Sequence, residues 1–168
     1  MPTAAYTVDG LFGSTRTLEK GCVVVIDVVE LEQCLIDWAY QGMTTTLAAA
    51  ASDPRVRLHP ADIALVLTDS CDGPRGPWDA IVLDVDNGPD FLIHRENRAL
   101  YTERALQAAY EHLVPGGTLA IWCQRPSPSL QVILERIASS VREHVIDVTR
   151  GERSFAYVIY IASRQADS

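Results

Sequence analysis

The stretch Trp78–Pro89 reads Trp-Asp-Ala-Ile-Val-Leu-Asp-Val-Asp-Asn-Gly-Pro, and it decides the fold. Its apolar run, Ala80–Leu83, ends abruptly in acid, which is typical of a buried parallel strand whose carboxyl end emerges into a crevice. In open α/β sheets that crevice is where ligands bind. We therefore expect Asp84, Asp86 and Asp90 to lie together at the mouth of a binding site.

A helix and a second buried strand are expected after this acidic segment. Five residues, all apolar except Thr102, recur at alternating spacings of three and four, which predicts one helical face. They are Ala99, Thr102, Leu106, Ala109 and Leu113. Pro115, Gly116 and Gly117 are expected to end that helix, because Pro cannot continue the hydrogen-bond ladder and Gly accepts a left-handed turn. Thr118–Cys123 then predicts the next strand, so the segment reads as a strand-helix-strand crossover.

Strands and helices alternate along the rest of the chain. Strands are expected at Ala4–Val8, Cys22–Val29, Val56–His59, Val145–Thr149 and Phe155–Ala162. Helices are expected at Ser14–Glu19, Leu31–Ala39, Thr44–Ala51, Ile63–Leu67 and Leu130–Val141. The pattern predicts one α/β domain over residues 1–168, with a doubly wound Rossmann-like sheet. The sheet should be mostly parallel, with a C-terminal antiparallel hairpin strand, because the last two strands are joined by a short connection.

Two residues in the first half of the chain, Asp27 and Trp38, differ from the elements around them in polarity or size. Asp27 interrupts an otherwise apolar strand, so its side chain requires an edge or a polar partner that the sequence does not identify. Trp38 belongs to the apolar stripe of the following helix and is expected in the core rather than stacked on a ligand.

Composition excludes several classes of protein. The apolar fraction of 48% is ordinary for a soluble globular chain. The formal charge of −8 argues against nucleic acid as a partner and suits a cationic small molecule. No apolar run is long enough to span a membrane, and no signal peptide is evident, so a cytoplasmic location without membrane contact is expected.

The cysteines and histidines show no site of their own. The four Cys residues lack Cys-x-x-Cys or Cys/His metal spacing, so no metal is expected. Cys22, Cys34 and Cys123 lie in apolar patterns and are expected to be buried free thiols. The histidines show no triad spacing, and neither a Gly-x-Ser-x-Gly elbow nor a P-loop is present.

The segment Asp79–Pro89, together with Leu113–Trp122, resembles the second half of the spermidine-synthase-like proteins. These are aminopropyltransferase relatives built on the fold of the class I S-adenosylmethionine-dependent methyltransferases. Val28–Glu32 and Asp53–Asp62 resemble the ends of that family's second and third strands. The resemblance begins at about Gly10, so it implies a shortened N-terminus. It also implies S-adenosylmethionine or its decarboxylated form as cofactor, a small-molecule amine as substrate, and a homodimer.

The resemblance places the cofactor at successive strand ends. Glu30 stands at the position of the ribose acid, and Asp62 at that of the adenine-side acid, with Ile63 as an apolar wall. Gly10 and Gly13 remain of the glycine turn that approaches the cofactor, although relatives carry more glycines there. The alternatives are local: helix-start acids at positions 30 and 62, and a plain structural turn at the glycines.

The catalytic prediction concerns the acidic segment. By resemblance Asp84 is the base that takes a proton from the attacking amine, and Asp86 anchors the substrate's ammonium. Asn87, Asp90 and Tyr101 are expected to line the same pocket. The alternative is that Asp84 and Asp86 only shape a tight turn.

The leading prediction of function is aminopropyl transfer to an amine. The first alternative keeps the cofactor and changes the reaction to methyl transfer on a small molecule. The second is a non-catalytic relative that uses the sheet as a binding module, which the altered glycine turn motivates.

Overall fold

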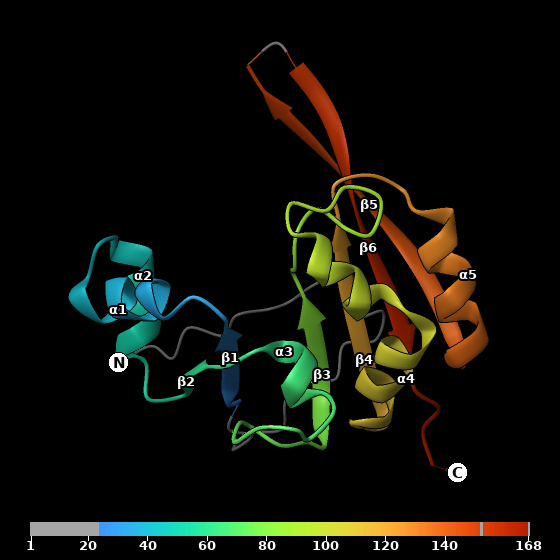
Figure 1. The fold of residues 1–168 in the computed structure, drawn as a ribbon. Coiled ribbons are helices and arrows are strands. Elements are labelled where there is room, and N and C mark those ends of the chain that lie inside the picture. The colour runs from blue at the N-terminus through green and yellow to red at the C-terminus, as the bar shows by residue number, and fades with distance from the viewer. Residues whose placement is uncertain (1–23, 152, 168) are drawn as a thin grey trace, which may run out of the picture.

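The computed structural model describes residues 24–151 and 153–167, and shows alternating strands and helices (Figure 1). The strands are β1 (Ile26–Glu30), β2 (Val56–Pro60), β3 (Trp78–Leu83), β4 (Leu113–Cys123), β5 (Ser140–Arg150) and β6 (Arg153–Ser163). The helices are α1 (Gln33–Gln41), α2 (Thr45–Ser52), α3 (Ile63–Val66), α4 (Glu103–Glu111) and α5 (Pro128–Ile137), with a 3-10 helix, η1 (Arg95–Tyr101). The strand expected at Ala4–Val8, the glycine turn and the helix expected at Ser14–Glu19 lie outside the described residues.

The strands form two sheets. β1 and β2 pair in parallel, and the second sheet has the order β3-β4-β6-β5. Within it β3 and β4 are parallel, whereas β6 is antiparallel to both β4 and β5. The α/β class and the antiparallel C-terminal hairpin are therefore confirmed. Among the described residues β1 and β3 each pair on one side only, so the two sheets do not join in one ladder.

The core lies between the four-stranded sheet and the helices that cover one of its faces, α4 and α5 (Figure 1). Alternate residues of each strand point into it, as the period of two requires. Its fully buried members include Leu106, Leu113, Leu119, Ile121, Leu134, Val158 and Tyr160. Each such aliphatic side chain contributes roughly 1.5–3 kcal/mol to folding. On the opposite face Val82 is 64% exposed.

The helix predicted over residues 99–113 is wrong in detail. Thr102 is extended (φ −78°, ψ 151°) and separates η1 from α4, which it caps by accepting a hydrogen bond from the Ala105 N–H. A side-chain acceptor at this position satisfies a free N–H of the first helical turn, so the chain starts a new helix here. The Pro-Gly-Gly segment does not precede β4 but lies inside it, where the pairing with β3 shifts register between Trp78 and Ala80.

Helix α5 is also shorter than predicted. It ends at Ile137, because Ala138 is extended (ψ 151°) and the following residues enter β5. Val141, which continues the helical spacing in the sequence, pairs instead with Ala162 of β6. Pairing with β6 overrides the local helical pattern here.

The apolar stripe of α1 is only partly covered. Ile36 and Ala39 are buried, but Trp38 is 44% exposed and Leu31 is 64% exposed. The expectation that Trp38 lies in the core is therefore wrong. The reason is that, among the described residues, α1 packs mainly against α2, β1 and β2, which do not enclose its full apolar face.

The partner that Asp27 requires is His59. The Asp27 Oδ1 and His59 Nε2 atoms lie 2.8 Å apart, and both side chains are partly buried. Because Asp27 is opposite Arg57, it lies diagonally across from His59 on the same face of the sheet. The polar residue inside an apolar strand is thus satisfied by the neighbouring strand.

Within the described residues, no helix is long and apolar enough to cross a membrane.

The cysteines differ in exposure, which gives a direct test of the packing. Cys123 is 1% exposed, and burial together with the charge of Asp90 raises its pKa to about 12. Cys34 is exposed, contrary to the sequence prediction, and Cys71 is intermediate. The thiolate is the reactive form. At pH 8 we expect Ellman's reagent to label Cys34 rapidly and Cys123 only after denaturation.

The labelling is best measured in a Cys22→Ser background, so that only thiols of described residues are counted. A Cys34→Ser change in that background should remove the fast phase. Rapid labelling of Cys123 in the folded protein would contradict the packing described above.

Candidate active site at the carboxyl ends of β3 and β4

The acidic segment lies where two parallel strands end side by side. Leu83 of β3 pairs with Ile121 of β4, so the residues after both strands emerge at the same edge of the sheet. Asp84 follows β3 directly and is exposed. Among residues 24–151 and 153–167 its carboxylate has no hydrogen-bond or ion-pair partner. It is therefore a carboxylate available to a ligand.

Asp86 has a different role in the local structure. Its backbone has a positive φ of 56°, a conformation that Asp tolerates better than most residues. Its carboxylate accepts hydrogen bonds from the Ile93 N–H (3.2 Å) and from Asn97 Nδ2 (2.8 Å). Asp86 thus fixes the loop between β3 and η1, and only its remaining lone pairs can face a substrate.

Tyr101 fixes the backbone of the same loop through a hydrogen bond. It is 6% exposed, and its hydroxyl donates to the Val85 carbonyl. Its pKa is raised chiefly by burial, and then by the negative groups of Cys123, Asp86 and Asp84. The phenol therefore stays protonated and holds the backbone between the two acids. Its predicted contact with a substrate remains a prediction.

The loop also packs tightly against the end of β4. Gly88 has a φ of +91°, and a Cβ at this position would lie 2.8 Å from the Cys123 Sγ. The Asn87 carbonyl accepts a hydrogen bond from the Gln124 N–H at 3.1 Å. Asp90 is exposed and is close enough to Cys123 for its charge to raise the thiol's pKa. The structure thus brings Asp84, Asp86 and Asp90 to one edge of the sheet, as the sequence predicts.

The two predicted cofactor acids lie at the ends of the other sheet. Glu30 ends β1, and its Oε1 accepts from the Glu32 N–H at 2.9 Å. Asp62 caps α3, where its Oδ1 accepts from the Ala64 N–H at 2.8 Å. The Ala61 N–H donates to the Glu30 carbonyl at 3.1 Å, so both acids belong to one cluster of strand ends.

The local contacts that the sequence offered as alternatives are therefore present, but they use one oxygen of each carboxylate. In the part of the chain that the structure describes, the second oxygen accepts no hydrogen bond. A cap and a ligand contact are thus compatible.

Ile63 lies beside Asp62 and is partly buried against the core. Gly10 and Gly13 lie outside the described residues, and within those residues no group of three or more His, Cys, Asp or Glu could hold a metal.

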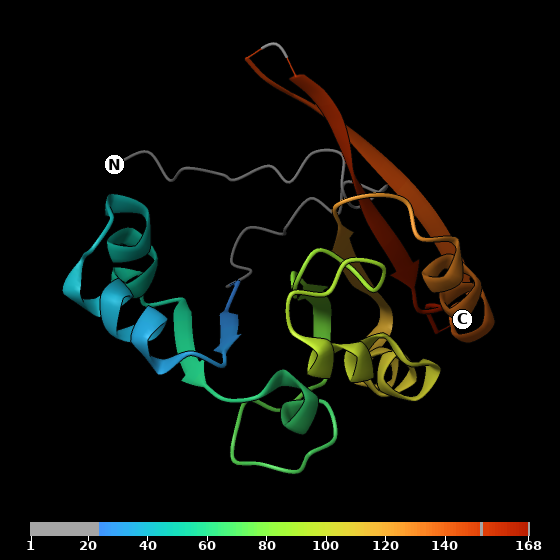
Figure 2. The same cartoon turned by 45° about the horizontal axis from the view of Figure 1, so that its top comes forward.

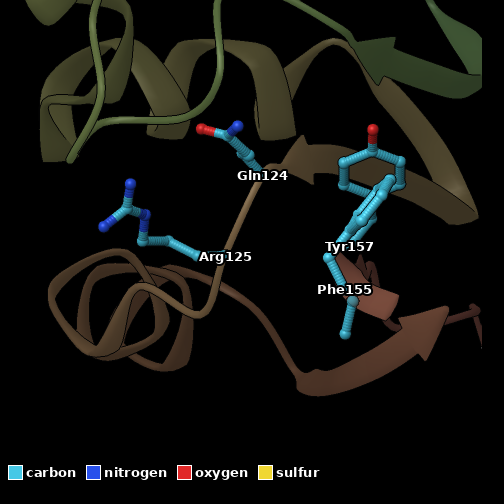
Figure 3. A pocket seen from close by; sticks show the side chains of 5 residues that line it. Gln124, Arg125, Phe155 and Tyr157 are labelled. Atoms are coloured by element: carbon cyan, nitrogen blue, oxygen red, sulfur yellow. The ribbon is translucent and has the colours of Figure 1, made fainter. Parts of the chain in front are cut away.

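A recess that the sequence analysis missed opens beside the acidic loop. It measures about 400 Å³ and is lined by Gln124, Arg125, Phe155, Ala156 and Tyr157, which we call the aromatic recess. Figure 3 shows Gln124 and Arg125 on the connection that leaves β4, and Phe155 and Tyr157 across from them on β6. The sequence does carry a signal, because aromatic residues alternate at positions 155 and 157, as neighbours on one face of a strand do.

Comparisons with known proteins agree with this architecture. No family model matches the sequence. Spermine synthase from Arabidopsis thaliana is 34% identical over 99 residues, which is 58% of this chain but 24% of that protein. Spermidine synthase from Thermotoga maritima has a TM-score of 0.59 at 16% identity, covering 85% of this chain and 45% of that one. Human methyltransferase-like protein 13, in complex with SAH, has a TM-score of 0.58 at 19% identity, covering 85% and 61%.

These likenesses, with the strand order and the acids at the strand ends, define the class: the chain has the Rossmann-like methyltransferase fold. Over 99 residues its sequence is also similar to that of a spermine synthase. The chain spans about half or less of the synthases that it matches, so its activity is a separate question.

Proposed function

We propose that this chain transfers an aminopropyl group from decarboxylated S-adenosylmethionine to an amine. The observation that carries the proposal is Asp84, an exposed carboxylate at the end of β3 with no partner among the described residues. A general base must be free to accept a proton in the way that Asp84 is and Asp86 is not. The similarity to a spermine synthase supports the choice of reaction.

In the proposed reaction Asp84 has one role, which is to act as the general base. When bound, the cofactor supplies an electrophilic carbon next to a sulfonium, which leaves as a neutral thioether. Asp84 accepts the proton that an ammonium must lose before its nitrogen lone pair can attack. With the donor bound, the C–N bond would form as its C–S bond breaks, and the Asp84 carboxylate would hold the proton that the ammonium loses.

The donor set at the other strand ends fits a nucleoside. We assign Glu30 to the ribose hydroxyls and Asp62 to the adenine, each through the carboxylate oxygen that its local hydrogen bond leaves free. Ile63 provides an apolar surface for the base. Gly10 and Gly13 are assigned to the backbone turn near the cofactor.

On the acceptor side we assign the substrate contacts to the acidic loop. Asp86 and Asp90 supply negative charge for an ammonium, and the Asn87 side chain supplies a polar contact. Tyr101 acts through the backbone that it holds at Val85.

Methyl transfer from S-adenosylmethionine is the second candidate. It is favoured by the similarity in fold to the human methyltransferase-like protein, which was solved with SAH bound and has nearly the same TM-score as the synthase. The two reactions differ in the cofactor's carboxylate, which needs hydrogen-bond donors that an acidic crevice does not offer.

Calorimetric titration with decarboxylated S-adenosylmethionine, S-adenosylmethionine and methylthioadenosine tests the proposal. We expect the decarboxylated form to bind best, because its amine lacks the carboxylate that the acidic loop would repel. A preference for S-adenosylmethionine would select methyl transfer instead. No binding of any of the three to folded protein would leave the chain a non-catalytic relative.

A pair of neighbouring variants controls the titration. Glu30→Gln should weaken binding of all three ligands by about tenfold, the effect of losing one charged hydrogen bond. Glu32→Gln should have no effect, because Glu32 makes no side-chain hydrogen bond in its N-cap position. Equal losses in both variants would contradict the assignment of Glu30.

A further inference from the structure

The acidic loop, residues 84–94 between β3 and η1, is tied together through one carboxylate. The Asp86 Oδ2 atom accepts a hydrogen bond from Asn97 Nδ2 at 2.8 Å, and its Oδ1 atom accepts one from the Ile93 N–H at 3.2 Å. Asp86 stands near the start of the loop, whereas Ile93 stands at its end and Asn97 in η1. Each oxygen of the carboxylate therefore has a donor from the far end of the loop.

Asn97 is itself held by the core. It lies in η1, where its N–H donates to the His94 carbonyl at 3.1 Å. Leu100 and Tyr101, about one turn further along η1, are 5% and 6% exposed and belong to the hydrophobic core. Their burial fixes the element that carries the amide. Asn97 is thus the fixed partner, and the Asp86 carboxylate is the group whose position it sets.

The backbone of Asp86 needs such a restraint. Its φ of 56° lies in the left-handed region, which costs free energy for a residue with a side chain and persists only where the surrounding contacts impose it. Among the described residues the hydrogen bonds to this carboxylate come from Ile93 and Asn97. Without the Asn97 amide, residue 86 can relax toward negative φ and redirect the backbone on both sides. Asp84 lies two residues before it and Gly88 two residues after it.

The loop covers a thiol that can report on its position. Gly88 packs so closely on Cys123 that an added Cβ would lie 2.8 Å from the sulfur, and the Asn87 carbonyl accepts a hydrogen bond from the Gln124 N–H. Cys123 is 1% exposed, so a thiol reagent reaches it only when the loop moves or the protein unfolds. The rate of Cys123 labelling therefore measures opening of the loop without substrate or cofactor.

We propose that Asn97 is a positioning residue, which holds the Asp86 carboxylate and through it the loop that presents Asp84. An amide suits this role, because its NH2 group donates to the carboxylate without adding a positive charge that would compete with a substrate ammonium. The presentation of Asp84 rests on the proposed function. The effect of Asn97 on the loop does not.

The first experiment follows labelling by Ellman's reagent at pH 8 in a background where the other three cysteines are replaced by serine. Asn97→Ala should speed the labelling of Cys123 at least tenfold, the effect of losing one hydrogen bond to a charged group. Gln131→Ala is the matched control, because it also removes an amide hydrogen bond of 2.8 Å to a carboxylate, that of Glu135 on α5. The control should label at the background rate.

An exchange of the two side chains tests the contact itself. Asn97→Asp alone sets two carboxylates against each other, and their repulsion should open the loop and speed the labelling. Adding Asp86→Asn restores a donor and an acceptor, because the amide at position 86 can accept from the Ile93 N–H and donate to the carboxylate at position 97. The double variant keeps the net charge of the single one plus one, and should return the labelling close to the background rate.

Turnover separates positioning from a general loss of structure. In Asn97→Ala the kcat for methylthioadenosine release should fall on the order of 10- to 100-fold, the cost of a catalytic group misplaced by about 1 Å. The affinity for decarboxylated S-adenosylmethionine should be unchanged. The reason is that the assigned cofactor acids, Glu30 and Asp62, lie at the strand ends of the other sheet.

Three results would overturn the proposal. They are labelling of Asn97→Ala at the background rate, faster labelling that its urea unfolding curve fully explains, and a double variant that labels as fast as Asn97→Asp. If the labelling behaves as expected but the protein transfers nothing, Asn97 positions the loop and the transfer function fails. If transfer occurs and Asn97→Ala changes neither labelling nor kcat, the function stands and the positioning role fails.

Discussion

Replacing Asp84 by Asn is expected to slow transfer by on the order of 10²- to 10⁴-fold, the usual contribution of general-base catalysis. Asparagine has nearly the same shape but cannot accept a proton from an attacking ammonium. Because the Asp84 carboxylate makes no hydrogen bond or ion pair with a described residue that would be lost, the fold and the affinity for the cofactor should be unchanged. The loss should therefore appear in turnover and not in cofactor binding.

The measurement is methylthioadenosine release from decarboxylated S-adenosylmethionine with a panel of amines, read by mass spectrometry. Asp79→Asn is the matched control, because Asp79 is exposed on the same strand, near its opposite end. It should retain full turnover. Unaffected release from Asp84→Asn would remove Asp84 from its role as base and leave the segment a structural turn.

The position of Asp84 could be predicted because one local signal was sufficient. An apolar run that stops in acid places that acid at a strand end, and the pairing of Leu83 with Ile121 confirms it. It could not be predicted that the Asp86 carboxylate is hydrogen-bonded within the loop while the Asp84 carboxylate has no hydrogen-bond partner among the described residues. This difference depends on Asn97, which reaches Asp86 only because the chain forms η1 and then restarts at Thr102. The sequence pattern suggested one continuous helix instead.

Periodicity also shows which face of an element is apolar without showing what covers it. The stripe of α1 was correctly recognised, yet Trp38 and Leu31 are substantially exposed because the described neighbours of α1 are few. The two sheets illustrate the same point. A strand was predicted within each of their strands, although the first residues of β4 and β5 were assigned to helices. Whether β1 and β3 share a ladder is a property of the whole assembly of strands. Figure 2 shows β1 and β3 as separate arrows in the turned view.

The aromatic recess was missed because its residues come from separate parts of the chain. Phe155 and Tyr157 belong to an expected strand, whereas the sequence pattern assigns Arg125 to no helix or strand. A comparison of strand lengths would have helped. The last strand is longer than the part of β4 that pairs with it, so the residues before Val158 extend past the last pair of the ladder between β4 and β6.

The second large effect is expected from Gly88→Ala. The added Cβ would lie 2.8 Å from the Cys123 Sγ, and the φ of +91° is one that a side chain rarely adopts. Strain and overpacking together should lower the free energy of unfolding by about 2–5 kcal/mol. Gly151→Ala is the matched control, since Gly151 also has a positive φ, of 62°, but has nothing within 4 Å of the added carbon. It should cost only about 1–2 kcal/mol.

Urea unfolding of both variants separates the clash from the backbone strain. Adding Cys123→Ala to Gly88→Ala removes the sulfur from the contact and should recover part of the lost stability. Equal costs at Gly88 and Gly151 would show that the loop does not press on β4 as described. Because Gly88 lies between Asp86 and Asp90, relief of the clash by loop movement would also displace those carboxylates. Gly88→Ala should therefore lower transfer more than its stability alone explains, which ties the packing of the loop to the chemistry at Asp84.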